Sequence, residues 1–209
     1  MLFLLLLILI LFLYLFKNNS CTERFEINPC IDNLTDRQYL EHMIPHHQVA
    51  VDISILLQKK SKSPVIQDIL RKLIWTQKYE IELMKNILLN ISNNKINNFE
   101  NNYYIPTKSD FISPNKLGIT KTYCDPHFFD PDGHMKHLEH MTLDNESYIK
   151  HMIPHHQVAV DMSKILLKNT KNDFMIYLAY RIIRNQKSEI IILNNLLEKN
   201  IYMHSSKLI

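Results

Sequence analysis

Glycine is nearly absent from this sequence, which contains only Gly118 and Gly133 among its 209 residues. Nucleotide-binding loops, Rossmann turns and tight β-hairpins need glycine where the backbone φ is positive, so long helices are the simplest alternative. The formal net charge is only +3 and no run of basic residues occurs, which gives no support to nucleic acid as a partner. The sequence also lacks Glu-x-x-His, found in di-iron enzymes, and His-Glu-x-x-His, found in zinc peptidases. We therefore do not predict an enzyme.

An internal repeat organises the chain. The undecapeptide HMIPHHQVAVD occurs at His42–Asp52 and again at His151–Asp161, an offset of 151 − 42 = 109 residues. The same offset pairs Gln77 with Gln186 and Glu80 with Glu189, without a gap. A repeat of this kind fixes the architecture, because each copy is one supersecondary unit. The chain is therefore predicted to hold two copies of one helical unit.

Each copy has the pattern of a helical hairpin. N-cap candidates, apolar periodicity and turn residues predict helices at Asp36–Lys60, from Pro64 to about Asn90, at Tyr148–Asn169, and from Asn172–Asp173 to about Asn200. Pro45 lies inside the first helix, so a kink or a separate first segment is expected. Two hairpins predict an all-α, ferritin-like four-helix bundle. The hairpins span 34–91 and 134–203, and 92–133 is predicted to be a linker.

An apolar segment, Leu2–Phe16, precedes the repeats. As a helix it would measure roughly 22 Å, shorter than the ~30 Å hydrocarbon core of a membrane. It fits the apolar region of a signal peptide, with an uncleaved membrane anchor as the alternative. We assign residues 1–20 to this hydrophobic helix. Either alternative predicts an exported protein or one attached to a membrane through its N-terminus.

The chain has three cysteines, two of them in the short segment 21–33. Cys21 and Cys30 are close enough in sequence for a disulfide that closes a short loop, which an oxidising compartment would permit. Cys124 would then be left over. It is predicted to be free, to pair with another chain, or to join a metal site.

The repeated motif places histidines and a methionine on the apolar face of its helix. At 100° per residue, His42, Met43, His46 and His47 share one arc with the apolar residues that follow. Imidazole binds Cu(II) and Cu(I), and thioether prefers Cu(I). Met162, which replaces Ile53, adds a thioether to the second copy. The predicted metal ligands are His42, Met43, His46, His47, His151, Met152, His155, His156 and Met162.

Two further groups of residues bear on the predicted site. Polar side chains recur on the core-facing stripe of each partner helix, where a carboxylate can orient a metal-bound imidazole. These supporting residues are Gln77, Glu80, Gln186 and Glu189. The lead-in to the second repeat is a short histidine-rich tract, which is a compositional signal for metal binding. Its candidate additional ligands are His134, Met135, His137, His140 and Met141.

The motif HMIPHHQ-x-AVDM, followed further along by Q-x-x-E-I, resembles the ferritin-like family known as domain of unknown function 305. The resemblance covers both repeats and implies a four-helix bundle that is commonly exported. Some members look like periplasmic copper-binding and copper-resistance proteins with Met and His ligands. Carried over to this chain, these ligands are the nine motif residues given above. The first copy departs from the pattern at Ile53, where the family has methionine.

The prediction is therefore an exported or membrane-anchored protein that binds copper for sequestration or resistance. Zinc is one alternative, because His42, His46, His151 and His155 would supply a tetrahedral site. A metal-independent helical interaction module is another. In that case the histidines would only pack in the core. Each motif copy has three histidines within six residues, however, and each buried ring would need partners for its two nitrogens. Protein partners are not predicted.

Overall fold

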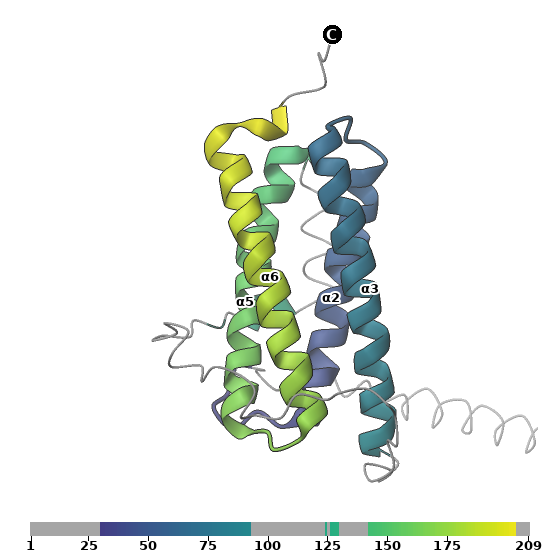
Figure 1. The fold of residues 1–209 in the computed structure, drawn as a ribbon, viewed down its shortest axis with the longest axis vertical. Helices are drawn as coiled ribbons and strands as arrows, with labels where there is room; N and C mark the ends of the chain where they lie inside the picture. The colour runs from purple at the N-terminus through teal and green to yellow at the C-terminus, as the bar shows by residue number, and fades with distance from the viewer. Residues whose placement is uncertain (1–29, 93–123, 125, 130–141, 204–209) are drawn as a thin grey trace, which may run out of the picture.

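The structure is a computed structural model that describes residues 30–92, 124, 126–129 and 142–203. Four long helices run side by side in two hairpins (Figure 1). They are α2 (Asp36–Gln58), α3 (Pro64–Ser92), α5 (Asn145–Asn169) and α6 (Asp173–Lys199), with the short 3₁₀ helices η3 (Pro126–Phe129) and η4 (Ile201–Met203). The predicted all-α bundle of two repeated hairpins is confirmed.

Local sequence sets the ends of these helices. Thr35 caps α2 by accepting from the Gln38 backbone, and the Gln38 side chain accepts in return from the Thr35 backbone, which makes a capping box. Asp144 and Ser147 form the same box at α5. Asn200 caps the C-terminal end of α6, and its positive φ of 51° is the left-handed conformation typical of a helix terminus.

Proline does not divide either motif helix. Pro45 lies inside α2, which is continuous from Asp36 to Gln58, and Pro154 lies inside α5 in the same way. The alternative in which the first turns form a separate segment is therefore wrong. Packing compensates for the lost hydrogen bond, because the turns on both sides of Pro45 are held by buried residues of the motif.

The two hairpins join through reciprocal contacts between α2 and α5. The Tyr39 hydroxyl lies 2.7 Å from Ser163 Oγ, and the Tyr148 hydroxyl lies 2.7 Å from Ser54 Oγ. Tyr39 corresponds to Tyr148 and Ser54 to Ser163 by the same offset, 148 − 39 = 163 − 54 = 109. Such exchanged contacts are the signature of two-fold symmetry. The motif copies therefore face each other across an approximate two-fold axis inside the bundle.

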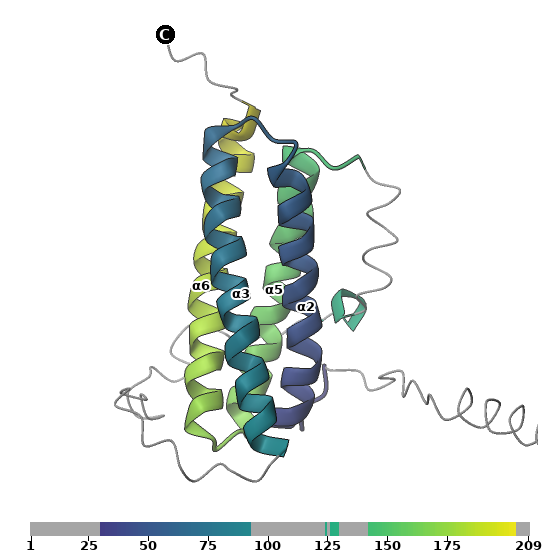
Figure 2. The ribbon, with the colours of Figure 1, turned by 90° about the vertical axis from the view of Figure 1, so that its right-hand side faces the viewer.

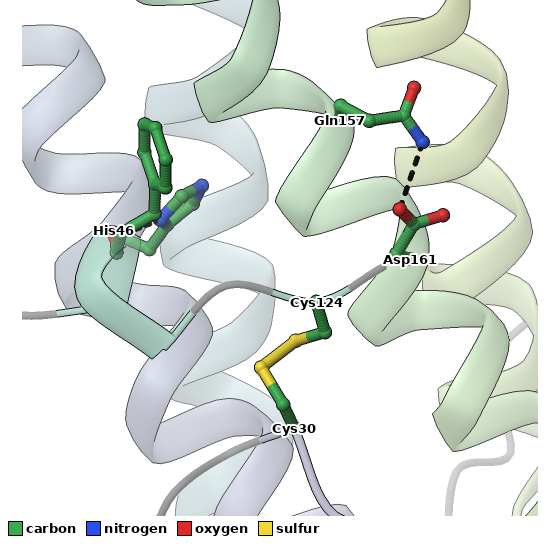
Figure 3. The surroundings of a disulfide bond; sticks show 6 residues. Cys30, His46, Cys124, Gln157 and Asp161 are labelled. Atoms are coloured by element: carbon green, nitrogen blue, oxygen red, sulfur yellow. Dashed lines mark hydrogen bonds between the residues drawn. A yellow bond between two sulfur atoms is a disulfide. The ribbon is translucent and has the colours of Figure 1, made fainter. Parts of the chain in front are cut away.

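The disulfide differs from the one predicted. Cys30 is bonded to Cys124, across a sequence separation of 94 residues, so the predicted Cys21–Cys30 pair is wrong. Figure 3 shows the bond joining the chain just before α2 to the chain just before η3. Sequence proximity favoured the short loop, but the fold brings Cys124 back beside the start of α2. Cys124 is therefore neither free nor a metal ligand here.

Several predicted features lie outside the described residues. These are the apolar segment Leu2–Phe16, most of the linker, and the histidine-rich tract at 134–141. Within the linker, the structure describes η3, which lies beside α2 on the side of the bundle away from α3 and α6 (Figure 2). Among the helices that are described, none combines the length and hydropathy needed to cross a membrane.

Candidate metal centre

Two histidines, one from each copy of the motif, stack at the middle of the bundle. The rings of His46 and His155 lie 3.7 Å apart between centroids with an interplanar angle of 17°. Their residues are 2% and 1% exposed. Two charged rings at this separation would repel by about 4 kcal/mol even at an effective dielectric constant of 20, so at least one ring is neutral. A neutral imidazole keeps one nitrogen lone pair, which is what a metal ion binds.

The short helix η3 covers this histidine stack. The Phe128 carbonyl oxygen lies 2.8 Å from His46 Nδ1, and because a carbonyl only accepts, Nδ1 carries the proton. The lone pair of neutral His46 is then on Nε2, which is buried. Phe129 packs 4.8 Å from the His46 ring, and Phe128 lies 6.1 Å from the His155 ring. Backbone and rings of η3 thus orient histidines of both copies.

A second pair of histidines is held by carboxylates of the partner helices. His47 Nε2 lies 3.1 Å from Glu80 Oε2, and His156 Nε2 lies 2.7 Å from Glu189 Oε2. Both rings are fully buried. His47 Nε2 is hydrogen-bonded to Glu80, which favours the proton on that nitrogen and leaves the lone pair on Nδ1, as in carboxylate–histidine–metal arrangements. His156 Nε2 and Glu189 Oε2 are close enough for an ion pair but lack hydrogen-bond geometry within the described residues. Nδ1 of both rings is buried with no hydrogen-bond partner in the described part of the chain, so these residues fit a metal ion.

The surroundings of the two carboxylates differ. Glu80 is fully buried and accepts from Asn185 Nδ2 at 2.8 Å, and Arg181 Nε lies 3.3 Å from the same oxygen. In the other copy, Lys72 and Thr76 occupy the positions of Arg181 and Asn185 (181 − 72 = 185 − 76 = 109), and Lys72 pairs with Asp68 instead. Glu80 is therefore fixed by three groups, whereas Glu189 is 17% exposed.

The two glutamines also differ. Gln186 Nε2 lies 3.4 Å from His47 Nε2. Gln77 is only 1% exposed, yet neither its Nε2 nor its Oε1 has a hydrogen-bond partner within the described residues. An unpartnered buried amide costs free energy, so it marks a place where a water molecule or a bound ion completes the network.

The motif methionines are fully buried but fall in two apolar clusters. Met43 and Met162 belong to the first cluster, together with Met84 and Met175. Met152 belongs to the second cluster, where aliphatic residues occupy the positions equivalent to the other three thioethers. These equivalents are Ile53, Leu193 and Ile66, each offset by 109 residues from Met162, Met84 and Met175. The soft donors are thus concentrated in one half of the bundle.

The remaining predicted ligands are placed as follows. His42 is 5% exposed, and burial lowers its pKa, while nearby Glu41 opposes that shift. His151 is half-buried, and its ring centroid lies 5.8 Å from that of His155. No three His, Cys, Asp or Glu side chains of the described residues converge in a ready-made ligand set. Eight of the nine predicted ligands are therefore buried in the bundle and His151 is half-buried, and their metal coordination stays a prediction.

Sequence reasoning missed three parts of the site. Phe128 and Phe129 lie in a segment without periodicity, so no signal marked them as a cover. Arg181 and Asn185 differ from their counterparts in the first copy, so the repeat did not select them. The identity of Ser54 and Ser163 in both copies was an available signal for the cross-repeat hydrogen bonds.

Comparison with known proteins gives three findings. The family model described as Domain of unknown function (DUF305) matches residues 26–88 and 145–207. The solved structures of CopM are similar: the silver-bound form is 25% identical with a TM-score of 0.57 and covers 80% of this chain and 97% of CopM. The Cu(II)-bound form is 26% identical (TM-score 0.56; 80% and 98% covered) and the Cu(I)-bound form 27% identical (TM-score 0.55; 79% and 96% covered). An uncharacterized protein of Acanthamoeba polyphaga mimivirus is 39% identical over 55 residues, which are 26% of this chain and 36% of that protein.

Proposed function

The chain belongs to the DUF305 family, and from this premise we propose that it is a copper-binding protein that sequesters or passes on the metal. The proposed ligands are the histidines and methionines of the two motif copies. The single observation that carries the proposal is that His47 and His156, each fully buried beside a glutamate carboxylate, have no hydrogen-bond partner for Nδ1 among the described residues.

The donor set favours copper over other metals. Buried imidazole nitrogens combined with buried thioethers suit Cu(I) and Cu(II), whereas hard cations prefer oxygen ligands. The similar structures of CopM include Cu(I)-bound, Cu(II)-bound and silver-bound forms, and Ag(I) is a soft ion with the same ligand preference as Cu(I). Structural zinc, the alternative raised by the four histidines, would not use the methionines.

Burial favours storage or transfer of the ion over catalysis. His47, His156 and the motif methionines Met43, Met152 and Met162 have 0% exposure. A metal bound among them would be shielded from water and from dissolved oxidants, which suits sequestration. A catalytic metal needs an open coordination position that a substrate can reach.

We also propose that the protein works outside the reducing cytosol. The Cys30–Cys124 disulfide supports this location, because disulfides persist in oxidising compartments. The apolar segment Leu2–Phe16 would direct export or anchor the chain in a membrane.

The experiment is a Cu(I) titration of the full chain, purified without an affinity tag, against a chromogenic Cu(I) chelator. The double variant His155→Ala/His156→Ala should lower the number of tightly bound ions per chain, because it removes one ring of the stack and one carboxylate-held ring. The matched control is His204→Ala, which removes a histidine outside both motifs. Unchanged competition by the double variant would contradict the proposal.

A further inference from the structure

A surface groove between α3 and α6 reaches one of the two His–Glu pairs. The groove has a volume of about 730 Å³, and Glu189 and Asn185 line it together with the exposed Trp75. Glu189 also contacts buried His156 at 2.7 Å. A single side chain therefore connects the solvent-filled groove to the buried histidines.

On the other side of the bundle, η3 covers the histidines. There, η3 packs Phe129 against His46, and the Phe128 carbonyl accepts from that ring. The Cys30–Cys124 disulfide ties the chain before η3 to the chain before α2 (Figure 3). The stacked rings of His46 and His155 close the seam between α2 and α5.

The charge in the groove favours cations. Its charged lining residues are Asp68, Lys72 and Glu189, which sum to −1 − 1 + 1 = −1. Lys72 is committed to Asp68, with Nζ 2.7 Å from Oδ2, so it does not neutralise Glu189. Glu80 is different, since Arg181 lies beside it. A carboxylate at the base of an apolar-walled groove concentrates the local field and attracts counter-ions.

We propose that this groove is the path by which copper reaches the buried histidines, with Glu189 as the residue that receives the ion and passes it to His156. The inference rests on the proposed copper-binding function and adds a route and a role to it. Glu80, fully buried and held by Arg181 and Asn185, keeps only a positioning role toward His47. The repeat has thus produced one open and one closed His–Glu pair.

The chain carries its own reporter for this path. Trp75 is the only tryptophan, it is 70% exposed, and it lines the same groove as Glu189. Cu(II) quenches indole fluorescence at short range, so Trp75 should respond as the ion passes and binds. Rapid mixing of the full chain with Cu(II) therefore gives an uptake rate constant, and metal analysis of the desalted product gives the final stoichiometry.

Glu189→Gln should lower the uptake rate constant about tenfold, the lower end of electrostatic steering effects. Because Glu189 also lies against His156, the variant should weaken equilibrium binding as well, and this is measured separately from the rate. The wild-type rate constant should fall with added salt, and that of Glu189→Gln should fall less. Glu82→Gln removes the same charge from an exposed site on α3 outside the groove and should load at the wild-type rate. Ser188→Phe, which adds bulk to the groove wall, should also slow loading, whereas Lys78→Phe should not.

The outcomes separate this inference from the function on which it rests. If wild-type protein takes up no copper, the proposed function itself fails. If wild-type protein loads and Glu189→Gln loads equally fast, with the same salt dependence, the groove is not the route. If Glu189→Gln weakens equilibrium binding but loads at the wild-type rate, Glu189 only positions His156 and the entry role is wrong.

Discussion

Removal of the Cys30–Cys124 disulfide should have one global and one local effect. The bond closes a loop of 94 residues. In the chain-entropy model, a loop of that length restricts the unfolded state by about 4.6 kcal/mol at 25 °C, and measured values for disulfides are typically about 2–4 kcal/mol. We therefore expect Cys124→Ser to lower the free energy of unfolding by about 2–4 kcal/mol.

The local effect follows from what the disulfide holds in place. Cys124 lies just before η3, whose Phe128 carbonyl accepts from His46 and whose Phe129 ring covers it. Without the bond, the cost of closing a long loop opposes the docking of η3. The His46–His155 stack should then become accessible, and histidine-directed acylation of the metal-free protein should proceed faster than in the wild type.

The assay is urea denaturation of oxidised wild type and Cys124→Ser, with histidine acylation measured on the same samples. Cys21→Ser is the matched control, because it removes a cysteine and leaves the observed disulfide intact. If Cys21→Ser lowers the free energy of unfolding and Cys124→Ser does not, the disulfide is Cys21–Cys30 and the reasoning is refuted. A stability loss without faster acylation would show that η3 docks without its tether.

Two further predictions concern the contacts between the copies and the thioethers. Ser54 donates to the Ala50 carbonyl, so the Tyr148 hydroxyl donates to Ser54, and Tyr148→Phe should cost about 1 kcal/mol in urea denaturation. Burial raises the pKa of Tyr148 and the nearby Glu189 carboxylate raises it further, so the folded state retains this proton longer than the unfolded state. Stability should therefore fall as pH rises above about 10, and less in Tyr148→Phe; an equal fall in both proteins would contradict this. Met162→Ile should weaken Cu(I) binding at least about tenfold and leave Cu(II) binding unchanged, because only Cu(I) prefers thioether. Competition titrations with both ions test this, and equal Cu(I) affinity would reduce Met162 to a packing residue.

The sequence was sufficient to predict the fold. The predicted start of the second helix at Pro64 matches α3, and the predicted end at Asn169 matches α5. These features are local, since caps, proline and apolar period act within a few turns of helix. The repeat then required the two hairpins to cover each other's apolar faces, which fixed the bundle.

The sequence could not predict how the copies meet. Helical periodicity places His46 and His47 on the buried face, but the partner of His46 depends on the offset between α2 and α5, which brings it to His155. The contact of His47 with Glu80 lies within one hairpin, where the sequence did predict a carboxylate beside a histidine. The role of Cys124 likewise depends on where a long connection returns, which spacing along the chain does not determine.

The differences between the two copies carry as much information as the repeat itself. Glu80 is closed in by Arg181 and Asn185, and one turn further along α3 lies Met84, a member of the methionine-rich cluster. Glu189 faces the groove, and the equivalent position one turn further along α6 is Leu193. The fully buried glutamate thus adjoins the half that is rich in soft donors, and the glutamate that faces a groove adjoins the half that is poor in them. Two identical halves would bind a metal ion with equal affinity, so neither would be favoured. Here a soft cation that enters beside Glu189 should bind more tightly among the thioethers of the other half.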